Sequence, residues 1–211
     1  MTDAGGTQVS PRLYVVDDDT AVRDSLVELF RLEGFEVEAF SNGAEFISRA
    51  QKEPACTILD VQMPGRSGLD ILSILQASTY PEPIFIMSGH GDIPMAVRAI
   101  KDGAFDFFEK PFDADTVIER VRSALGSRRD RESADAELPP SFPGGTLLTA
   151  RERQVLSEIT GGASNKEAGR RLGISPRTIE VHRARIMEKL GARNAADLVR
   201  IVYTGNGSVE G

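Results

Sequence analysis

The chain has few of the residues that support disulfide, zinc or membrane chemistry. Among its 211 residues there is one cysteine, Cys56, and there are two histidines, His90 and His182, far apart in the sequence. A lone cysteine in the apolar run CTILD cannot form an internal disulfide and is expected to be a small buried side chain. The two separated histidines predict no zinc site. No apolar run approaches the roughly 18 residues that a membrane-spanning helix needs, so a membrane-embedded protein is excluded.

A secretory signal is also lacking. The first ten residues, MTDAGGTQVS, have neither the basic start nor the apolar core of a signal peptide. We therefore expect a loose N-terminal tail and a cytoplasmic protein.

Basic residues are scarce in the first part of the chain. Residues 1–126 carry 11 lysine and arginine residues against 21 acidic ones, and residues 127–146 carry 3 against 4, whereas residues 147–211 carry 11 against 7. Because a basic surface attracts nucleic-acid phosphates and an acidic one repels them, nucleic-acid binding is expected in the last part of the chain.

What the chain does have, from Leu13 to Leu125, is an alternation of short apolar runs with stretches of helical periodicity. Runs such as LYVV, TIL and IFIM are typical of strands buried on both faces of a parallel sheet. The predicted strands are Leu13–Asp17, Glu36–Phe40, Cys56–Asp60, Ile84–Ser88 and Asp106–Glu109. The predicted helices are Ala21–Leu32, Ala44–Gln51, Leu69–Gln76, Pro94–Lys101 and Ala114–Leu125. This rhythm predicts an α/β fold, a doubly wound five-stranded parallel sheet covered by helices.

The remainder of the chain differs in composition. Residues 127–146, SRRDRESADAELPPSFPGGT, mix dense charge with proline and glycine and have no apolar period, which predicts a linker. Helical patterns without strand signals follow at Ala150–Thr160, Lys166–Leu172, Pro176–Leu190 and Ala195–Val202. The sequence thus predicts a first domain over residues 12–126, a linker over 127–146 and an all-α domain of four helices over 147–204.

Oxygen-bearing and ammonium side chains stand at the ends of the predicted strands. They are Asp17, Asp18 and Asp19 after the first strand, Asp60 after the third, Ser88 after the fourth and Lys110 after the fifth. The carboxyl ends of parallel strands meet at one edge of a sheet, so these groups are expected to converge. Clustered carboxylates need a cation, and oxygen ligands suit Mg²⁺. Mg²⁺ and the Lys110 ammonium would neutralise an incoming phosphoryl group, so that Asp60 can accept it and the Ser88 hydroxyl can bind its oxygens.

Two alternatives to a phosphorylation site are open from the residues alone. Isolated aspartates at strand ends often form surface turns, although the combination at four strand ends is much rarer by chance. An aspartyl-phosphate hydrolase also places a nucleophilic aspartate after a strand, with an acid–base aspartate two residues later. This chain has Gln62 at that position, so turnover of outside substrates would lack its general acid.

The segments VVDDD, LDVQMPGRSG, MSGHGD and FFEKPF resemble the receiver domains of two-component response regulators over nearly all of residues 12–126. The resemblance implies the flavodoxin-like strand order 2-1-3-4-5 and identifies Asp60 as the phospho-acceptor. It further implies a magnesium site formed by Asp17, Asp18, Asp60 and the backbone of Gln62, phosphoryl binding by Ser88 and Lys110, and a switch pair formed by Ser88 and Phe107. Asp19 falls outside the family's acidic pair, and the Lys110–Pro111 bond is expected to be cis.

The segment SNKEAGRRLGISPRTIEVHRARIMEKLG predicts a helix-turn-helix. Ser164 or Asn165 can cap the first helix, Gly173 ends it, and Ser175 with Pro176 begins the second. A core-facing stripe is expected at Ile179, Ile186 and Leu190, and the opposite side carries Arg177, Glu180, Val181, Ala184 and Arg185. Valine and alanine beside arginines suit thymine methyls and guanine in a major groove. A solvated basic helix is the alternative.

Preceded by LTARERQVL, this segment resembles the LuxR-type output domain across about residues 147–203. The two-domain layout resembles the NarL/FixJ class of response regulators, and its details are most similar to FixJ-type members. The resemblance implies that Glu180, Val181 and Ala184 face bases. It implies contacts with DNA phosphates for Asn165, Lys166, Thr178, His182, Arg183 and Lys189.

The resemblance implies a transcription regulator that is switched by phosphorylation. A sensor histidine kinase would donate to Asp60, Ser88 and Phe107 would move inward, and the receiver would form a homodimer through its last strand and last two helices. The unphosphorylated receiver is expected to restrain the output domain, whose partners are promoter DNA and RNA polymerase and whose expected effect is activation. Beyond accepting and slowly losing its own phosphoryl group, the chain is not expected to be an enzyme. A ligand-gated regulator of the quorum-sensing type shares the output domain, but the complete acidic site argues against it.

Overall fold

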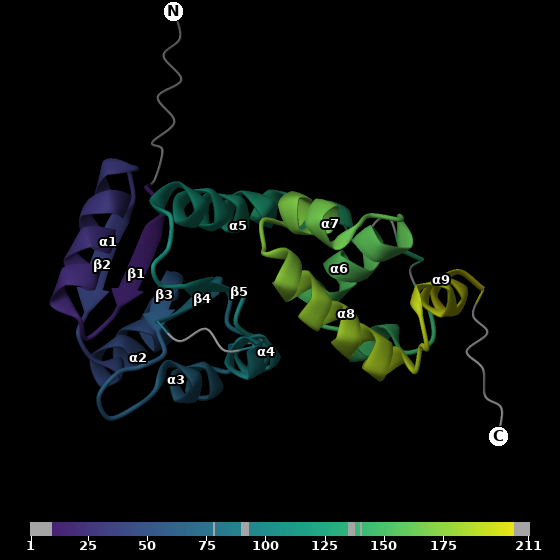
Figure 1. The fold of residues 1–211 in the computed structure, drawn as a ribbon, viewed down its shortest axis with the longest axis horizontal. Helices are drawn as coiled ribbons and strands as arrows, with labels where there is room; N and C mark the ends of the chain where they lie inside the picture. Colours follow the sequence, from purple (N-terminus) through teal and green to yellow (C-terminus); the bar gives the residue numbers. More distant parts are fainter. Residues whose placement is uncertain (1–9, 78, 90–92, 135–137, 140, 205–211) are drawn as a thin grey trace, which may run out of the picture.

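The computed structural model describes residues 10–77, 79–89, 93–134, 138–139 and 141–204. Figure 1 shows a body containing a sheet and an all-helical body, next to each other along the long axis of the molecule. The predicted N-terminal tail, except for its last residue, and His90 lie outside the described residues. Every helix within the described residues is too short or too polar to cross a lipid bilayer.

The first body contains a parallel sheet of five strands in the order β2-β1-β3-β4-β5, as predicted. The strands are β1 (Arg12–Val16), β2 (Glu36–Phe40), β3 (Cys56–Asp60), β4 (Ile84–Ser88) and β5 (Asp106–Glu109). The register pairs Asp60 with Met87 and Ser88 with Glu109. The carboxyl ends of the three strands β3, β4 and β5 therefore lie next to one another.

Helices cover both faces of the sheet, because each strand alternates its side chains between the two faces. In β1, Leu13 and Val15 belong to the core beneath α1 (Thr20–Leu32) and α5 (Ala114–Ala134). Tyr14 and Val16 belong to the core on the opposite face, together with α2 (Gly43–Lys52), α3 (Gly68–Leu75) and α4 (Ile93–Lys101). Burial on both faces explains the continuous apolar runs of the strands. Cys56 is buried, and burial raises the pKa of its thiol, as expected for a structural side chain.

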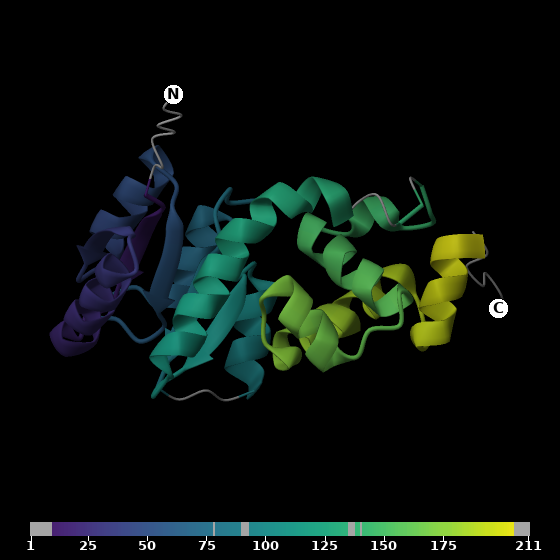
Figure 2. The same cartoon turned by 90° about the horizontal axis from the view of Figure 1, so that it is seen from above.

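Helix α5 differs from the prediction. It does not end at Leu125 but continues to Ala134, inside the segment predicted to be a linker. The absence of an apolar period indicates that a segment lacks a buried face, yet Arg, Glu and Ala in residues 127–134 still have high helix propensity. The predicted end of this helix at Leu125 is thus wrong, and the first part of the segment predicted to be a linker, residues 127–134, is helical. Figure 2 shows α5 reaching from the sheet to the helical body.

The second body begins with η1 (Gly145–Leu147) and contains α6 (Ala150–Thr160), α7 (Asn165–Leu172), α8 (Pro176–Leu190) and α9 (Ala195–Thr204). Helices α7 and α8 form the predicted helix-turn-helix. Ser164 caps α7, and Gly173 ends it in the left-handed region at a φ of 66°. Ser175 caps α8, with Pro176 in its first turn. The Ile179 and Ile186 side chains of the predicted stripe are fully buried, and Leu190 is partly buried.

The two bodies contact each other directly. Helix α8 packs against α4, and α5 packs against α6 and α7. One hydrophobic cluster contains Phe105 and Val121 of the first body together with Leu148 and Val155 of the second. The Arg151 guanidinium lies 4.2 Å from the centre of the Phe105 ring, a cation–π distance. The second body is therefore docked on the α4–β5–α5 side of the first.

Candidate phosphorylation site and DNA-binding surface

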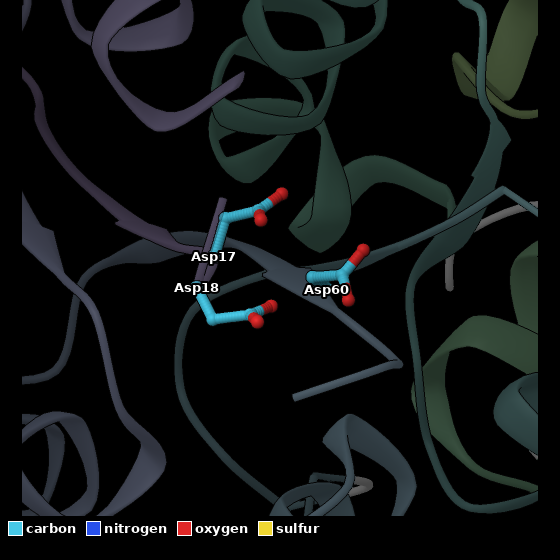
Figure 3. A group of neighbouring side chains, drawn as sticks. All are labelled: Asp17, Asp18 and Asp60. Carbon is cyan, nitrogen blue, oxygen red and sulfur yellow. The ribbon is translucent and has the colours of Figure 1, made fainter. Parts of the chain in front are cut away.

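Three carboxylates gather where β1 and β3 end, at one edge of the sheet (Figure 3). Each of Asp17, Asp18 and Asp60 offers an oxygen, and these oxygens lie within 4.8 Å of one another. Asp17 and Asp60 are buried, with 1% and 4% of their surface exposed, whereas Asp18 is exposed. Such a group is favourable only if a cation lowers the mutual repulsion of the carboxylates.

Lys110 supplies a positive charge from the chain itself. Its Nζ lies 2.7 Å from Asp17 Oδ2 and 2.7 Å from Asp60 Oδ1. The Lys110 backbone N–H donates to the carbonyl of Ser88, which ties the ends of β4 and β5 together. The Lys110–Pro111 bond is cis, as the resemblance implied. The ammonium therefore sits between the two buried carboxylates.

The pKa values at this edge reflect burial opposed by pairing. Burial raises the pKa of Asp60 above its ordinary value, and the hydrogen bond and charge of Lys110 offset only part of that effect. Burial lowers the pKa of Lys110, but its hydrogen bonds to Asp17 and Asp60 outweigh burial, and the pKa is raised. One ammonium does not balance the acidic group.

The backbone after β3 holds the Asp60 carboxylate in place. The Gln62 N–H donates to Asp60 Oδ2 at 2.6 Å. The Gly68 N–H donates to the Val61 carbonyl. A Cβ on Gly68 would lie 2.3 Å from the Asp60 carbonyl oxygen, so no larger residue fits here without moving that backbone. Gly68 is a site residue that could not be predicted, since nothing in the sequence shows how closely two chain segments approach.

Asp19 stands apart from the acidic group, as the resemblance implied. Its carboxylate accepts hydrogen bonds from the N–H groups of Ala21 and Val22 and caps α1. A capping carboxylate near a helix N-terminus is stabilised by the helix dipole and by those N–H groups. The third aspartate of the run thus begins a helix and is not among the three grouped carboxylates.

The two predicted switch residues lie near the site on neighbouring strands. Ser88 ends β4, and its side chain is buried with 1% of its surface exposed. Phe107 of β5 is partly buried and packs against the cluster that contains Ile86, Ala99 and Ile100. Their roles as a switch stay predictions.

The predicted DNA-contact residues divide into two groups. Eight of them, two on α7 and six on α8, have solvent-accessible side chains. Lys166, Glu180 and Ala184 are exposed, and Asn165, Arg177, Arg183, Arg185 and Lys189 are partly exposed. Thr178, Val181 and His182 are buried. Exposure had been predicted for Val181, and the structure contradicts it: Val181 belongs to the receiver cluster that contains Ala99 and Ile100 of α4. The first body covers part of the predicted DNA-binding side.

Other polar side chains of α8 contact protein groups in this structure. The Arg185 guanidinium donates to the Ile100 carbonyl of α4 at 3.2 Å. Lys189 Nζ lies 2.7 Å from Glu152 Oε2, and Glu152 is fully buried on α6. Asn165 donates to Glu180 and accepts from Arg183. These contacts order the basic side chains before any DNA is present.

His182 is buried beside a cavity of about 190 Å³ between the two bodies, which Arg151, Gln154 and Arg185 also line. Within the described residues neither ring nitrogen of His182 has a hydrogen-bond partner. Burial, with a smaller contribution from the Arg151 charge, lowers the pKa of His182 to about 3. In this arrangement His182 is neutral at pH 7 and is buried, whereas the resemblance implied contact with DNA phosphates.

Two fully buried acidic residues were not predicted from the sequence: Asp106, which joins the two bodies, and Glu152, which pairs with Lys189 inside the second body. The sequence pattern places Asp106 at the start of a strand and Glu152 within a helix, but it does not show that both carboxyl groups are fully buried. Glu152 carries one detectable signal, because Thr149 and Glu152 have capping-box spacing and the structure forms that box. Asp106 carries no such signal, since its partners are distant in the sequence.

Comparison with known proteins agrees with this architecture. A family described as the response regulator receiver domain matches residues 13–122, and one described as bacterial regulatory proteins of the luxR family matches residues 146–202. The transcriptional regulatory protein FixJ of Bradyrhizobium diazoefficiens is 41% identical over 190 residues, 90% of this chain and 93% of FixJ. The response regulator protein TodT of Pseudomonas putida is 40% identical over 202 residues, 94% of this chain and 88% of TodT.

Among solved structures, full-length FixJ from B. japonicum is 40% identical, covers 90% of this chain and 95% of that chain, and has a TM-score of 0.54. These similarities span both bodies and the connection between them. The chain therefore belongs to the two-component response regulators of the NarL/FixJ family, in which a receiver domain is joined to a LuxR-type DNA-binding domain, and it is similar to FixJ-type members.

Proposed function

We propose that a sensor histidine kinase phosphorylates Asp60 and thereby releases the output domain to bind promoter DNA. The observation that carries this proposal is the position of the Lys110 ammonium, 2.7 Å from both Asp17 and Asp60, beside a third carboxylate. The three grouped carboxylates carry more negative charge than the single positive charge of Lys110 neutralises. A site with this imbalance attracts a divalent cation and, with it, an anionic phosphoryl group.

The residues at this edge fit Mg²⁺, which prefers oxygen ligands and keeps some of its water. Asp17, Asp18, Asp60 and the backbone of Gln62 would hold it. When bound, Mg²⁺ would supply positive charge that stabilises the phosphoryl oxygens during transfer. The support in this chain is the set of three carboxylates with oxygens within 4.8 Å of one another.

The chain's own groups account for the transfer. A carboxylate oxygen of Asp60 attacks the phosphorus of the kinase phosphohistidine; the O–P bond forms as the P–N bond breaks, and the imidazole leaves with the electron pair. Lys110 holds the Asp60 side chain and would stabilise the phosphoryl oxygens, with the Ser88 hydroxyl as a further ligand. Gln62 stands where a hydrolase has its acid, so we expect the phosphoryl group to be lost slowly, to water, and no outside substrate to be turned over.

Phosphorylation would reach the output domain through Ser88 and Phe107. Their inward movement would change the α4–β5–α5 side, on which the output domain is docked, and make it available for a homodimer. The dimer would place two α8 helices on adjacent half-sites about one helical turn apart. Glu180, Val181 and Ala184 would then face bases, and we expect recruitment of RNA polymerase and activation of transcription. Coupling of about 1–3 kcal/mol would make this a biased equilibrium.

Intact-mass measurement with acetyl phosphate and Mg²⁺ tests the acceptor. We expect the wild-type chain to gain one phosphoryl group and Asp60→Asn to gain none. Asp19→Asn is the matched control, because Asp19 caps α1 and asparagine also caps helices well, so this variant should be labelled like the wild type. Labelling of the Asp60→Asn chain would refute the assignment.

Binding to duplex DNA tests the output. The chain treated with beryllofluoride, a phosphoryl mimic, should select duplexes from a random library, and binding should weaken steeply with salt because phosphate contacts release counterions. Substituting Lys166 with Ala should weaken binding to all duplexes alike, whereas Glu180→Gln should change which sequence is selected. Failure to select any duplex would refute the proposed DNA-binding function.

A further inference from the structure

Asp106, the first residue of β5, is a fully buried carboxylate whose partners lie in both domains. Within the receiver, its Oδ2 lies 3.2 Å from the Arg120 guanidinium of α5. From the output domain, the Ser175 backbone N–H donates to Oδ2 at 3.1 Å. The Thr178 hydroxyl donates to Oδ1. We call the hydrogen bonds of the Asp106 carboxylate to Ser175 and Thr178 the Asp106 contact.

The two output-domain donors stand at the N-terminus of α8. Ser175 is the capping residue of that helix, and Thr178 lies in its first turn. The unpaired N–H groups and the dipole of a helix N-terminus favour an anion, and a DNA phosphate is the anion that the start of a recognition helix meets. A carboxylate and a phosphate present the same kind of acceptor, a negatively charged oxygen, to these donors.

Further contacts between the two domains continue the Asp106 contact along α8. Val181, one turn along α8, is buried in the receiver cluster, and Arg185, one further turn along, donates to the Ile100 carbonyl. Thr178, Val181 and Arg185 are spaced so that they share one side of α8. The receiver therefore covers part of the side of the helix that is predicted to enter the major groove, beginning with its anion-binding end, while Glu180 and Ala184 stay exposed.

We propose that Asp106 takes the place of a DNA phosphate at the start of α8. In the docked chain its carboxylate occupies the Ser175 and Thr178 donors, so docking and DNA binding exclude each other through the same hydrogen bonds. This inference rests on the proposed function, because it requires α8 to bind DNA. It adds a specific competitor, supplied by the receiver, to the general expectation that the receiver restrains the output domain.

The position of Asp106 on β5 connects the contact with the phosphorylation site. Phe107 is the next residue, and Lys110 follows the same strand, which extends from Asp106 to Glu109. Strand residues rise by roughly 3.3 Å each, so Asp106 and Lys110 are only about 13 Å apart along the chain. A shift of the strand when Lys110 meets a phosphoryl group would reach the Asp106 carboxylate directly.

The first experiment measures DNA affinity of the full-length chain. The probe is the duplex that the beryllofluoride-treated wild type selects from a random library. Without beryllofluoride, Asp106→Asn should bind this duplex about tenfold more tightly than the wild type, which corresponds to about 1.4 kcal/mol. Asp24→Asn removes the same charge from an exposed site on α1 and should stay within about twofold of the wild type. With beryllofluoride, Asp106→Asn and wild type should bind alike, because docking is already released.

The second experiment needs no DNA and reads the contact itself by hydrogen exchange of the Ser175 amide. Asp106→Ala should accelerate this exchange at least several-fold, whereas Asp24→Ala should not. From the output side, Thr178→Val should accelerate exchange across the start of α8 and across α4, while Thr178→Ser, which keeps the hydroxyl, should not. If the Asp106 variants fold poorly, the Thr178 variants still test the contact, because they leave the receiver core unchanged.

The outcomes separate the two hypotheses. Unchanged Ser175 exchange in Asp106→Ala would overturn the contact whether or not the chain binds DNA. Equal affinities of Asp106→Asn and Asp24→Asn in the unphosphorylated chain would overturn the competition with DNA phosphate. If beryllofluoride-treated wild type selects no duplex, the proposed function is overturned and the competition with it, even where exchange shows that the contact exists.

Discussion

Two buried aspartates near the two ends of β5, Asp60 and Asp106, differ in the number of carboxylates and cations that surround them. At the carboxyl end, Lys110 forms ion pairs with Asp60 and Asp17, and a carboxylate oxygen of Asp18 lies in the same group. At the amino end, Asp106 is paired with Arg120 and accepts hydrogen bonds from Ser175 and Thr178. The first site has more carboxylates than ammonium groups, whereas the second pairs one fully buried carboxylate with one guanidinium. Burial raises the pKa of Asp106, and the Arg120 charge and the hydrogen bond from Thr178 offset only part of that effect.

This difference explains why one aspartate is suited to chemistry and the other to holding two domains together. An acidic excess at a partly open edge remains able to take a cation and a phosphoryl group from outside. A buried carboxylate with a guanidinium and two neutral donors has its hydrogen bonds satisfied within the protein, and removing any partner leaves it uncompensated. The following predictions test whether the two sites differ in this way.

The largest effect is expected when each aspartate loses its cation. Lys110→Met and Arg120→Met each leave buried carboxylates unpaired, and each should lower the free energy of unfolding by about 3–5 kcal/mol. Urea unfolding with Mg²⁺ or with a chelator then separates them. Mg²⁺ should restore much of the stability of Lys110→Met, because Asp17, Asp18 and Asp60 can hold the ion, and none of that of Arg120→Met. An equal response of both variants to Mg²⁺ would contradict the comparison.

A smaller effect is expected from Gly68→Ala, which tests how tightly the backbone at Asp60 is positioned. The new Cβ would lie 2.3 Å from the Asp60 carbonyl oxygen, and overpacking of this kind costs roughly 1–3 kcal/mol. Because a displacement of an ångström at a reacting group can cost about 100-fold, labelling by acetyl phosphate should slow by up to that factor. Wild-type labelling kinetics in this variant would show that the approach is not important for Asp60.

The docked side of α8 provides a pH-dependent test through His182. Its pKa is lowered from 6.5 to about 3, chiefly by burial, so between these values the unfolded chain binds a proton that the folded chain does not. Stability should therefore fall as pH drops below about 6.5, by about 2 kcal/mol at pH 5 relative to pH 8. Urea unfolding at both pH values should show a smaller loss, by about that amount, in His182→Leu. Parallel losses in wild type and variant would mean that His182 is not buried in this way.

The smallest effect concerns α5, which carries Arg120 and joins the two domains. Gly126 lies inside α5 with nothing within 4 Å of the site of a Cβ. Gly126→Ala should stabilise the chain by about 0.5–1 kcal/mol through helix propensity, seen as a Tm increase of roughly 1–4 °C. It also serves as the matched control for Gly68→Ala, since the same chemical change should act in the opposite direction. No gain in Tm would indicate that the helix ends near Leu125.

Local patterns in the sequence were sufficient for most of the fold. The strands Glu36–Phe40, Cys56–Asp60, Ile84–Ser88 and Asp106–Glu109 have the predicted bounds. Cys56–Asp60 and Ile84–Ser88 are short runs that are buried on both faces, whereas Glu36–Phe40 is partly exposed. Helix α8 has its predicted bounds because Ser175 and Pro176 are strong signals for its start and Gly191 is a strong signal for its end. The convergence of Asp60 with Lys110 was also predictable, since strand ends of a parallel sheet share an edge.

The features that were not predicted depend on contacts between distant segments. The Val181 side chain was expected to be exposed because the periodicity of α8 describes one helix and not what packs on it. Asp106 has partners from residues far along the chain, and no spacing rule connects them. The predicted end of α5 was wrong for a different reason, since polar residues of high helix propensity can continue a helix without any apolar period.

The continuous helix α5 and the short connection from Ala134 to Gly145 have a consequence for how the regulator responds to its own abundance. Docking within one chain is an intramolecular event, with an effective concentration of the order of millimolar that does not depend on the amount of protein. The proposed dimerisation is bimolecular and does depend on it. A cell that makes more of this protein would therefore favour the DNA-binding dimer at a given level of phosphorylation, so expression level and kinase activity would act as two inputs to the same response.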